Sequence, residues 1–403
     1  MGYELLSSIY YKNREQYDTI FQQRFNSDAC YMLPIALNGY NAFFIATNEI
    51  ATKVESIYLK NMQLESVCKQ LPGVAMNKYI LKNLVDEIML TNDIEGIYST
   101  RKEITDALNN NTSNKQARFI GIVKKYEKLI SNDVLSLNNC EDIRKLYDDI
   151  ALDEIDKNDL PDGDIFRKSE VSVYSATDKE KHKGIYPENS LIDFMTKSLE
   201  VLKDNNIAFL IRICIFHYLF GYAHPFYDGN GRVSRYISSY LLNNHLNILV
   251  ALRISYTIKN NKSSYYKAFD DCNNKKNKGD ITPFILMFLN VIENSLISLI
   301  EKLSEALEKL CFYDSMLRDE IFSLFNILHK RIIYILIQNA LFADEGMDID
   351  ELTKETEKGN TLIRQNIKEL QQKGIPIVIT RNGKKLLYSI DLERFELLGN
   401  ETS

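Results

Sequence analysis

An imidazole, a carboxylate, an amide and two guanidinium groups lie close together in the segment from His224 to Arg235. His224 is expected to be largely neutral near pH 7, because a histidine has an ordinary pKa of about 6.5, so it could accept a proton from an attacking hydroxyl. Asp228 offers the hard oxygen ligand that magnesium prefers when the metal also holds phosphate oxygens. This set of groups predicts an enzyme that binds a nucleoside triphosphate and transfers part of it.

The glycines of the same segment predict an anion site. Gly229 and Gly231, on either side of Asn230, let the backbone approach a phosphate, and a helix that continues through Arg232 would point its first amide groups at it. Arg232 and Arg235 are three residues apart, hence on one helix face, and both could reach one polyphosphate.

A simpler interpretation is a hairpin turn, because Asp-Gly-Asn-Gly is a good turn sequence and a histidine before proline is commonly a turn residue. That interpretation does not account for the two arginines that follow. The glycines are not a dinucleotide fingerprint either, because Ser234 stands at the third glycine position and a helix precedes the segment. The chain contains no Walker A motif.

Length and composition fit an ordinary globular protein. The 403 residues predict two or three domains, and the 45% hydrophobic and 26% charged residues are typical values. A net charge of −6 argues against a protein that mainly coats nucleic acid, although a local basic face could still bind it. The most apolar run, from Ile207 to Phe220, is too short to cross a bilayer and predicts a buried helix. Because there is no secretory signal and the six cysteines are widely spaced, we expect a cytoplasmic protein with reduced thiols and no membrane contact.

The N-terminal region is predicted to be helical. Apolar residues recur three and four positions apart from about Tyr31 to Met89, which predicts successive amphipathic helices. Thr100 and Glu103 have the spacing of a capping box, so a new helix should begin there and the preceding one should end near Gly96. The asparagine-rich stretch 109–114 predicts a loop.

The centre of the chain is predicted to contain a small hairpin between long helices. Apolar pieces at Val171–Val173 and Gly184–Tyr186, joined by charged residues, predict two short strands. Long helices are expected on both sides of segment 224–235, and another from Thr282 to Leu310.

The C-terminal part has a different pattern. Helices are expected at 320–341, 348–356 and 361–372, followed by strands at 377–380 and 386–390 around an Arg-Asn-Gly turn. This is the layout of a winged helix-turn-helix. Its last helix and hairpin carry six basic residues against one acid, which suits DNA phosphates or, equally, a protein surface; the basic residues are Arg364, Lys368, Lys373, Arg381, Lys384 and Lys385.

Segment 224–235 resembles the signature of Fic proteins, His-x-Phe-x-[Asp/Glu]-Gly-Asn-Gly-Arg-x-x-Arg, at every defined position. The resemblance extends over about residues 90–300, through the predicted hairpin and on to Tyr265-Tyr266, Asn273 and residues 279–284. It implies a protein adenylyltransferase that moves AMP from ATP to a Ser, Thr or Tyr hydroxyl of a target protein or of itself, with ATP and Mg²⁺ as cofactors.

The resemblance also implies the roles of individual residues. His224 would be the base, Asp228 the magnesium ligand, and Gly229, Asn230 and Gly231 the anion site. Arg232 and Arg235 would neutralise the triphosphate, while Tyr266 and Asn273 would line the nucleoside pocket. The hairpin resembles a flap that docks the target, and its docking residues would be Lys183, Gly184 and Ile185. His217 is expected to be a core residue.

Residues 91–96, Thr-Asn-Asp-Ile-Glu-Gly, resemble the family's inhibitory pattern, [Ser/Thr]-x-x-x-Glu-[Gly/Asn]. A forked pair between Glu95 and Arg235 would deny this guanidinium to the γ-phosphate of ATP. The same glutamate could instead position a water that removes AMP, which would make the protein a de-AMPylase. A third possibility is a DNA-binding regulator with a degenerate Fic core.

The expected fold class is therefore mainly α: a Fic-type helical core with a short β-hairpin flap, plus the winged helix. We expect an N-terminal helical region with the inhibitory helix at 1–112, a catalytic core at 113–312 and a winged-helix domain at 313–403. The expected partners are ATP, an unidentified target protein, DNA at the C-terminal domain, and a second copy of the chain in a homodimer.

Overall fold

A computed structural model describes residues 3–109, 118–174, 180–383 and 385–400. The chain is mainly helical, as predicted, with three small sheets among the described residues. It forms two compact units, the core unit (Met1–Asn61 and Val85–Ile297) and the tail unit (Met62–Leu84 and Ser298–Ser403). The domain boundaries expected at residues 112 and 312 stay a prediction.

The core unit begins with two helices and a hairpin, α1 (Leu6–Lys12), α2 (Arg14–Phe25), β1 (Cys30–Leu37) and β2 (Tyr40–Ile45). The hairpin corrects the prediction that helices begin near Tyr31. Leu33, Ile35 and Leu37 are buried at every second position of β1, which is a strand period. The turn between the strands, Asn38-Gly39, has positive φ at both residues, the backbone of a two-residue hairpin loop.

Successive helices follow the hairpin, as predicted for the later part of this region. They are α3 (Asn48–Cys68), α4 (Gly73–Ile94), α5 (Arg101–Asn109), α6 (Ile120–Ile130) and α7 (Cys140–Ile150). Helix α4 ends just before Gly96, which has a φ of 76°. The capping box is present, because the amide of Glu103 donates to the Thr100 hydroxyl and the amide of Thr100 donates to the Glu103 carboxylate. The predicted loop 109–114 lies almost wholly outside the described residues.

The predicted flap hairpin is present but one strand is shifted. Two 3-10 turns, η1 (Leu152–Glu154) and η2 (Lys157–Asp159), precede the antiparallel strands β3 (Ser172–Tyr174) and β4 (Glu180–Lys183). Strand β4 ends at Lys183, so Gly184–Tyr186, expected to be the second strand, follow it instead. The amide of Gly184 nevertheless donates to the carbonyl of Val171, which holds this segment beside the first strand.

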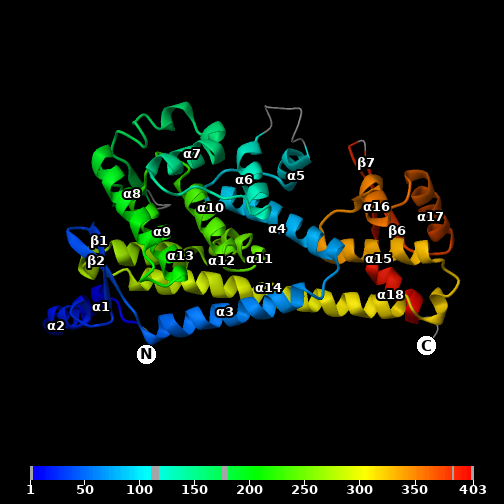
Figure 1. Cartoon of the computed structure of the whole chain (residues 1–403), viewed down its shortest axis with the longest axis horizontal. Coiled ribbons are helices and arrows are strands. Elements are labelled where there is room, and N and C mark those ends of the chain that lie inside the picture. Colours follow the sequence, from blue (N-terminus) through cyan, green and yellow to red (C-terminus); the bar gives the residue numbers. More distant parts are fainter. Residues whose placement is uncertain (1–2, 110–117, 175–179, 384, 401–403) are drawn as a thin grey trace. The chain divides into compact units, whose positions relative to one another are not determined.

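The centre of the core unit is a group of helices around α9. Helix α9 (Phe209–Ala223) has twelve of its fifteen residues buried, which confirms the predicted buried helix and explains why it shows no polar face. Helices α8 (Glu188–Lys203) and α10 (Asn230–Asn243) pack on it (Figure 1). The remaining elements are α11 (Ile248–Ala251), α12 (Ile254–Asn260), α13 (Lys262–Asn273) and η3 (Lys275–Asn277).

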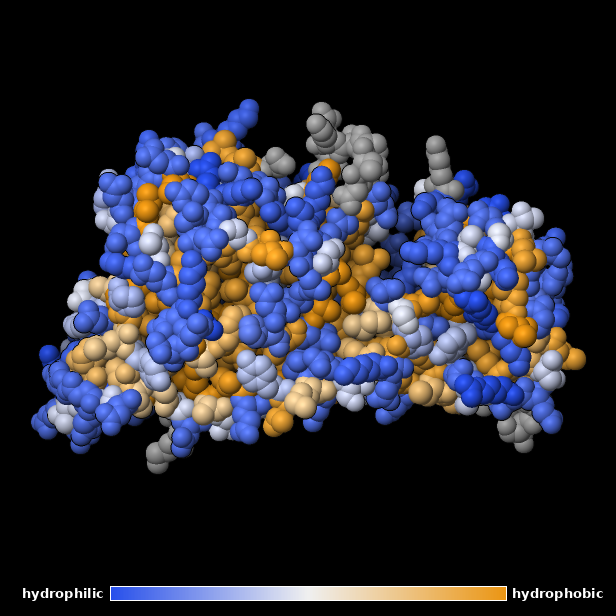
Figure 2. Space-filling view, viewed as in Figure 1, coloured by the Kyte–Doolittle hydropathy of each residue, from blue (hydrophilic) through white to orange (hydrophobic). Residues whose placement is uncertain are grey.

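Helix α14 (Thr282–Met316) extends past the predicted end at Leu310 and contributes residues to both units. Its length and apolar composition would allow it to cross a membrane, but 56% of its most apolar window is buried inside the structure. That burial is the pattern of a core helix. The visible face of the molecule is mostly hydrophilic, with hydrophobic residues interspersed (Figure 2).

The tail unit has the predicted order of three helices and a hairpin, although the first helix begins at Ile327 and not at residue 320. The elements that follow α14 in this unit are η4 (Glu320–Phe322), α15 (Ile327–Phe342), β5 (Met347–Asp348), α16 (Ile349–Thr356), α17 (Asn360–Gln372), β6 (Ile377–Asn382), β7 (Lys385–Ile390) and α18 (Leu392–Asn400). Strand β7 lies between β5 and β6 in one antiparallel sheet. Strand β5 and helix α18 were not predicted.

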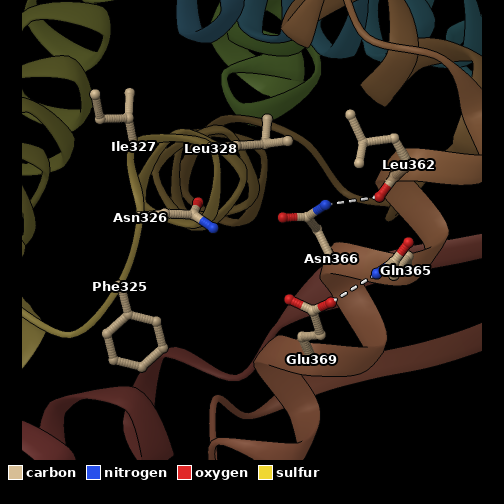
Figure 3. Close-up of a pocket in the computed structure, with 8 residues that line it drawn as sticks. All are labelled: Phe325, Asn326, Ile327, Leu328, Leu362, Gln365, Asn366 and Glu369. Carbon is tan, nitrogen blue, oxygen red and sulfur yellow. Dashed lines mark hydrogen bonds between the residues drawn. The ribbon is translucent and has the colours of Figure 1, made fainter.

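A groove lies between the start of α15 and the exposed side of α17 in the tail unit (Figure 3). Its walls include Phe325, Ile327 and Leu362, and the amide of Gln365 donates to Glu369 at 2.9 Å. The residues that line this groove include no histidine, lysine or arginine, so it lacks the general base and the cations that segment 224–235 supplies.

Candidate active site

His224 stands at the end of the buried helix α9. Its φ of 50° and ψ of 63° place it in the left-handed region, and its amide donates to the Phe220 carbonyl to close the helix. The half-buried imidazole lines a cavity of about 750 Å³ in the core unit. Burial, together with the positive charge of Arg167, lowers the pKa of His224 to about 4 against the opposing effect of Glu95. The imidazole is therefore neutral at pH 7 and available as a base.

The loop between α9 and α10 is fixed by the Asn230 side chain. The amide of Phe226 donates to Asn230 Oδ1 at 2.9 Å, and Asn230 Nδ2 donates to the Phe226 carbonyl at 2.8 Å. The loop closes at Gly229, whose φ of 81° favours glycine and whose added Cβ would lie 3.1 Å from Ala151 Cβ. The side chain of Asn230 thus fixes the loop at the predicted anion site and is itself engaged with the Phe226 backbone.

The first turn of α10 provides that backbone. The amides at the start of a helix have no partner within the helix, and the helix dipole makes this end favourable for a negative charge. Here the first turn begins at Asn230 and includes Gly231, which lines the cavity beside His224. The site predicted from the glycines therefore places the start of a helix beside a neutral base.

Arg235 is held by the end of α4. Its Nε donates to the Thr91 hydroxyl at 2.7 Å, and its Nη2 donates both to the Thr91 carbonyl at 2.9 Å and to Glu95 Oε1 at 2.8 Å. The pair with Glu95 is thus a single hydrogen bond to one carboxylate oxygen, which differs from the forked pair expected from the sequence. Because Nε donates to Thr91, the edge of the guanidinium formed by Nε and Nη2 is not free to make a fork with Glu95.

The Glu95 carboxylate also covers the start of α10. A Cβ added to Gly231 would come within 2.1 Å of Glu95 Oε1 and 2.8 Å of Arg235 Nη1. The carboxylate therefore lies directly over the backbone at which an anion would bind. The Glu95 carboxylate therefore contacts both the start of α10 and the Arg235 guanidinium.

Arg232 has a different partner, which the sequence did not indicate. Its Nη1 donates to Glu154 Oε2 at 2.7 Å, and both side chains are almost fully buried. Burial raises the pKa of Glu154 to about 6 in spite of the nearby Arg232 charge. Arg232 does not line the cavity; its Nη2 lies beneath Gly229, and neither Nε nor Nη2 has a hydrogen-bond partner within the described part of the chain.

Tyr266 and Asn273, expected at the nucleoside pocket, both line the cavity. The Tyr218 hydroxyl donates to Asn273 Oδ1 at 2.8 Å, which fixes the orientation of that amide. The ammonium of Lys262 lies 5.8 Å from the centre of the Tyr266 ring. Sequence reasoning missed several residues that complete the wall, because neither their type nor their spacing marks them: His182, Lys262, Ser263, Lys267, Phe269 and Asp270.

The flap residues lie next to His224. The amide of Ile185 donates to the Ala223 carbonyl at 3.0 Å, one residue before the base. Gly184 is needed there, because a Cβ would lie 2.4 Å from Arg167 Nη2. Lys183 is exposed and lies 3.7 Å from Glu170. Residues 175–179 of the hairpin lie outside the described residues.

His217 is buried away from the cavity lining. Its ring nitrogens contact the Ser238 hydroxyl at 2.8 Å and the Tyr265 hydroxyl at 2.7 Å, and burial lowers its pKa to about 3. These contacts place it in the core behind α10, where the sequence led us to expect it.

Asp228 fits a magnesium ion that is held mainly by a nucleotide. One of its oxygens accepts a hydrogen bond from the Gly229 amide at 2.6 Å, and Asp228 is not among the residues that line the cavity beside His224. No group of three or more metal-binding side chains occurs among the described residues. A lone carboxylate suits magnesium, since this ion commonly takes one or two protein carboxylates and completes its shell with phosphate and water oxygens.

Fold and site together define a helical protein in which a histidine and an arginine line one cavity beside the start of a helix. The model of the Fic/DOC family matches residues 137–242, so the chain carries a Fic/DOC family domain. This family is linked to AMPylation and related group transfers.

Solved structures are similar to this chain over most of its length. A Fic family protein from Desulfovibrio desulfuricans G20 has a TM-score of 0.53 at 18% identity, over 90% of this chain and 98% of that one. Fic-1 from C. elegans has a TM-score of 0.45 at 15% identity, over 75% and 82%. A Fic domain-containing signaling protein from Bacteroides thetaiotaomicron has a TM-score of 0.43 at 18% identity, over 62% and 97%. The first likeness shows that this chain has a Fic-type fold.

Proposed function

We propose that the protein transfers AMP from ATP to a hydroxyl group of a target protein, and that Glu95 restrains this activity. The observation that carries the proposal is the position of the Glu95 carboxylate, which lies over Gly231 and bonds to Arg235 at 2.8 Å. Because this carboxylate lies against the backbone at the start of α10, it would occupy the place of a phosphate of ATP.

The proposed reaction uses His224 as the base. The target hydroxyl attacks the α-phosphorus, its proton passes to the neutral imidazole, and the bond to the β-phosphate breaks to release pyrophosphate. The backbone at the start of α10 binds the phosphates, and Arg235, once released by Glu95, neutralises the γ-phosphate. Magnesium at Asp228 would offset the charge of the leaving pyrophosphate. The cavity of about 750 Å³ is large enough for a nucleotide.

The test compares the parent chain with Glu95→Gly and with Glu95→Gly/His224→Ala. Each is incubated with ATP labelled at the α-phosphate or at the γ-phosphate, and label on protein is measured. We expect the α label to appear on protein with Glu95→Gly, roughly tenfold or more above the parent, and to vanish in the double variant. Transfer of the γ label would instead show phosphorylation, and equal labelling of parent and Glu95→Gly would refute the restraint.

Removal of AMP is a second candidate reaction, favoured by the fact that Glu95 and His224 line the same cavity. In this reaction Glu95 would orient a water toward the phosphorus of a modified side chain. A target modified by Glu95→Gly and then incubated with the parent chain would lose AMP if the parent removes it. Retention of the label would exclude this direction.

We further propose that the tail unit binds duplex DNA. Helix α17 buries Ile363, Ile367 and Leu370 on one face and exposes Arg364 and Lys368 on the other. An exposed basic face of a helix next to a β-hairpin is a suitable shape and charge for a groove lined by phosphates.

A further inference from the structure

Arg167 is a buried arginine outside the segment 224–235, and the proposed reaction gives it no role. It is 1% exposed and its hydrogen bonds, within the described part of the chain, all go to backbone carbonyl groups. Burying a guanidinium costs free energy unless its N–H groups are hydrogen-bonded, so a buried arginine is expected to have a structural or functional role.

Two of those carbonyls belong to the end of α9. Arg167 Nε donates to the His224 carbonyl at 2.9 Å, and Nη2 donates to the Ala223 carbonyl at 3.3 Å. Carbonyls at a helix C-terminus have no partner within the helix, and a left-handed residue other than glycine costs about 1–3 kcal/mol unless its surroundings hold it. Arg167 therefore holds His224 in its unusual backbone conformation.

The other two carbonyls belong to the flap. Nη2 donates to the Ile185 carbonyl at 2.9 Å, and Nη1 donates to the Ser169 carbonyl at 2.6 Å. Ser169 leads into the hairpin and Ile185 leads out of it, so one planar group joins both ends of the flap to the residue that carries the base. The hydrogen bond from the Ile185 amide to the Ala223 carbonyl closes the same cluster.

The positive charge has a second effect. After burial, the charge of Arg167 is the largest influence that lowers the pKa of His224. A cation next to an imidazole disfavours its protonated form, so Arg167 helps to keep the base neutral.

We propose that Arg167 is a positioning residue that locks the flap and His224 to each other, so that a hydroxyl docked on the flap meets the base. This inference rests on the proposed transfer of AMP. It differs from the roles assigned to the motif residues, since Arg167 acts through backbone carbonyls and contacts neither ATP nor the target.

The test uses Arg167→Met and Arg167→Lys in the full chain with Glu95→Gly. Arg167→Met removes both the hydrogen bonds and the charge, whereas Arg167→Lys keeps the charge but cannot reach four carbonyls. The control is Arg144→Met, because Arg144 also donates to a carbonyl, that of Ile165, at 3.0 Å, while its other bond is to Asp148 and not to the flap or His224. Binding of ATP, kcat for the transfer of AMP and the pH profile of kcat are measured for each variant.

We expect Arg167→Met to lower kcat roughly 10- to 100-fold, as misplaced reacting groups do, while ATP binds as in the parent. The acidic limb of its pH profile should move to higher pH, because loss of the cation raises the pKa of His224. Arg167→Lys should lose kcat without moving this limb, and this variant keeps the test valid if the methionine variant does not fold. A kcat and a pH profile for both Arg167 variants equal to those of Arg144→Met would overturn the proposal.

Two further measurements separate this inference from the proposed function. Titration of the His224 ring signals by NMR gives its pKa, and hydrogen exchange of the Ile185 amide reports the attachment of the flap. If the Glu95→Gly chain transferred nothing, the proposed function would fail, yet these measurements would still decide the role of Arg167. We expect a raised His224 pKa and faster Ile185 exchange in Arg167→Met; no change in either would refute the locking role.

Discussion

The two arginines of segment 224–235 are both paired with carboxylates, but the pairs differ in burial. Both guanidinium groups are buried, but the Glu95 side chain keeps 22% of its surface exposed, whereas that of Glu154 keeps 8%. A partly exposed carboxylate can be displaced by a ligand from solvent, and a buried one cannot leave without stranding its partner. The first pair therefore suits regulation, and the second suits maintenance of the loop beneath Gly229.

Glu154→Gln should be strongly destabilising for this reason. The substitution leaves a buried guanidinium without its counter-charge, a change that costs about 3–5 kcal/mol in comparable buried pairs. The measurement is the free energy of unfolding in urea, with Glu95→Gln as control, which should lose less because Arg235 keeps its hydrogen bonds to the hydroxyl and carbonyl of Thr91. Equal losses for the two variants would show that the Arg232 pair is no more important to the fold than the Arg235 pair.

Glu87 gives a prediction about pH. This carboxylate is fully buried on α4, where it accepts hydrogen bonds from the Ser255 amide and hydroxyl, and burial raises its pKa to about 7. A raised folded-state pKa means that the stabilising effect is complete below the ordinary glutamate pKa of 4.5 and is lost as the pH rises through about 7. The parent should therefore lose stability relative to Glu87→Gln between pH 5 and 8, by an amount on the order of 1–3 kcal/mol. Urea unfolding of both chains across this range measures the difference, and parallel curves would contradict it.

At the scale of elements, Arg235 is held by several groups at the end of α4 and not by Glu95 alone. The last turn of α4 supplies the hydroxyl and the carbonyl of Thr91, and Glu95 follows immediately after it. The guanidinium is thus held from two directions. Loss of Glu95 alone leaves Arg235 attached to Thr91 and still aimed at the cavity.

Thr91→Val should therefore activate the enzyme less than Glu95→Gly does. Valine keeps the size of the side chain but removes the acceptor for Arg235 Nε, which weakens the hold on the guanidinium by about 1–3 kcal/mol. We expect labelling by α-labelled ATP above that of the parent and below that of Glu95→Gly. Thr105→Val, on helix α5, serves as a control for the substitution itself. Activity of Thr91→Val equal to the parent would assign the restraint to Glu95 alone.

The sequence predicted those features that local pattern determines. The helices on both sides of His224, the capping box at Thr100 and the order of elements in the tail unit each have a signal within a few residues. The hairpin at β1 and β2 was missed although Asn38-Gly39 between alternating apolar residues is a strong hairpin signal, because the helical period that follows dominated the interpretation. A short hairpin signal can therefore be overlooked when a longer helical pattern follows it.

Contacts between distant residues could not be predicted in the same way. Glu154 lies 78 positions from Arg232, within an acid-rich loop where no spacing distinguishes it from its neighbours. Within the described residues Arg167 donates hydrogen bonds only to backbone carbonyls. Every residue has a carbonyl, so the sequence does not indicate which ones an arginine will contact. Glu95 was an exception, since its family pattern indicated the pair with Arg235. That pattern could not supply Thr91 as the group that prevents a fork.

At the scale of the whole molecule, charge is divided unevenly. The chain has a net charge of −6, yet the exposed face of α17 presents Arg364 and Lys368, and Arg381 is exposed on the adjoining hairpin. Lys385 is partly neutralised, because it pairs with Asp348 at 2.5 Å. A protein that repels nucleic acid overall should bind it only where basic side chains gather, and here they gather on one helix and one hairpin.

The full chain should therefore bind duplex DNA of arbitrary sequence weakly and with a strong dependence on salt. Each phosphate neutralised contributes about 0.9 to the slope of log affinity against log salt concentration. Arg364→Ala/Lys368→Ala should lower that slope by about 2, one unit for each lost phosphate contact. Lys309→Ala removes an exposed lysine of α14 in the same unit and should leave the slope unchanged. Fluorescence anisotropy with a labelled duplex at several salt concentrations measures all three chains. An affinity insensitive to the double substitution, or equally reduced by Lys309→Ala, would mean that α17 does not contact DNA.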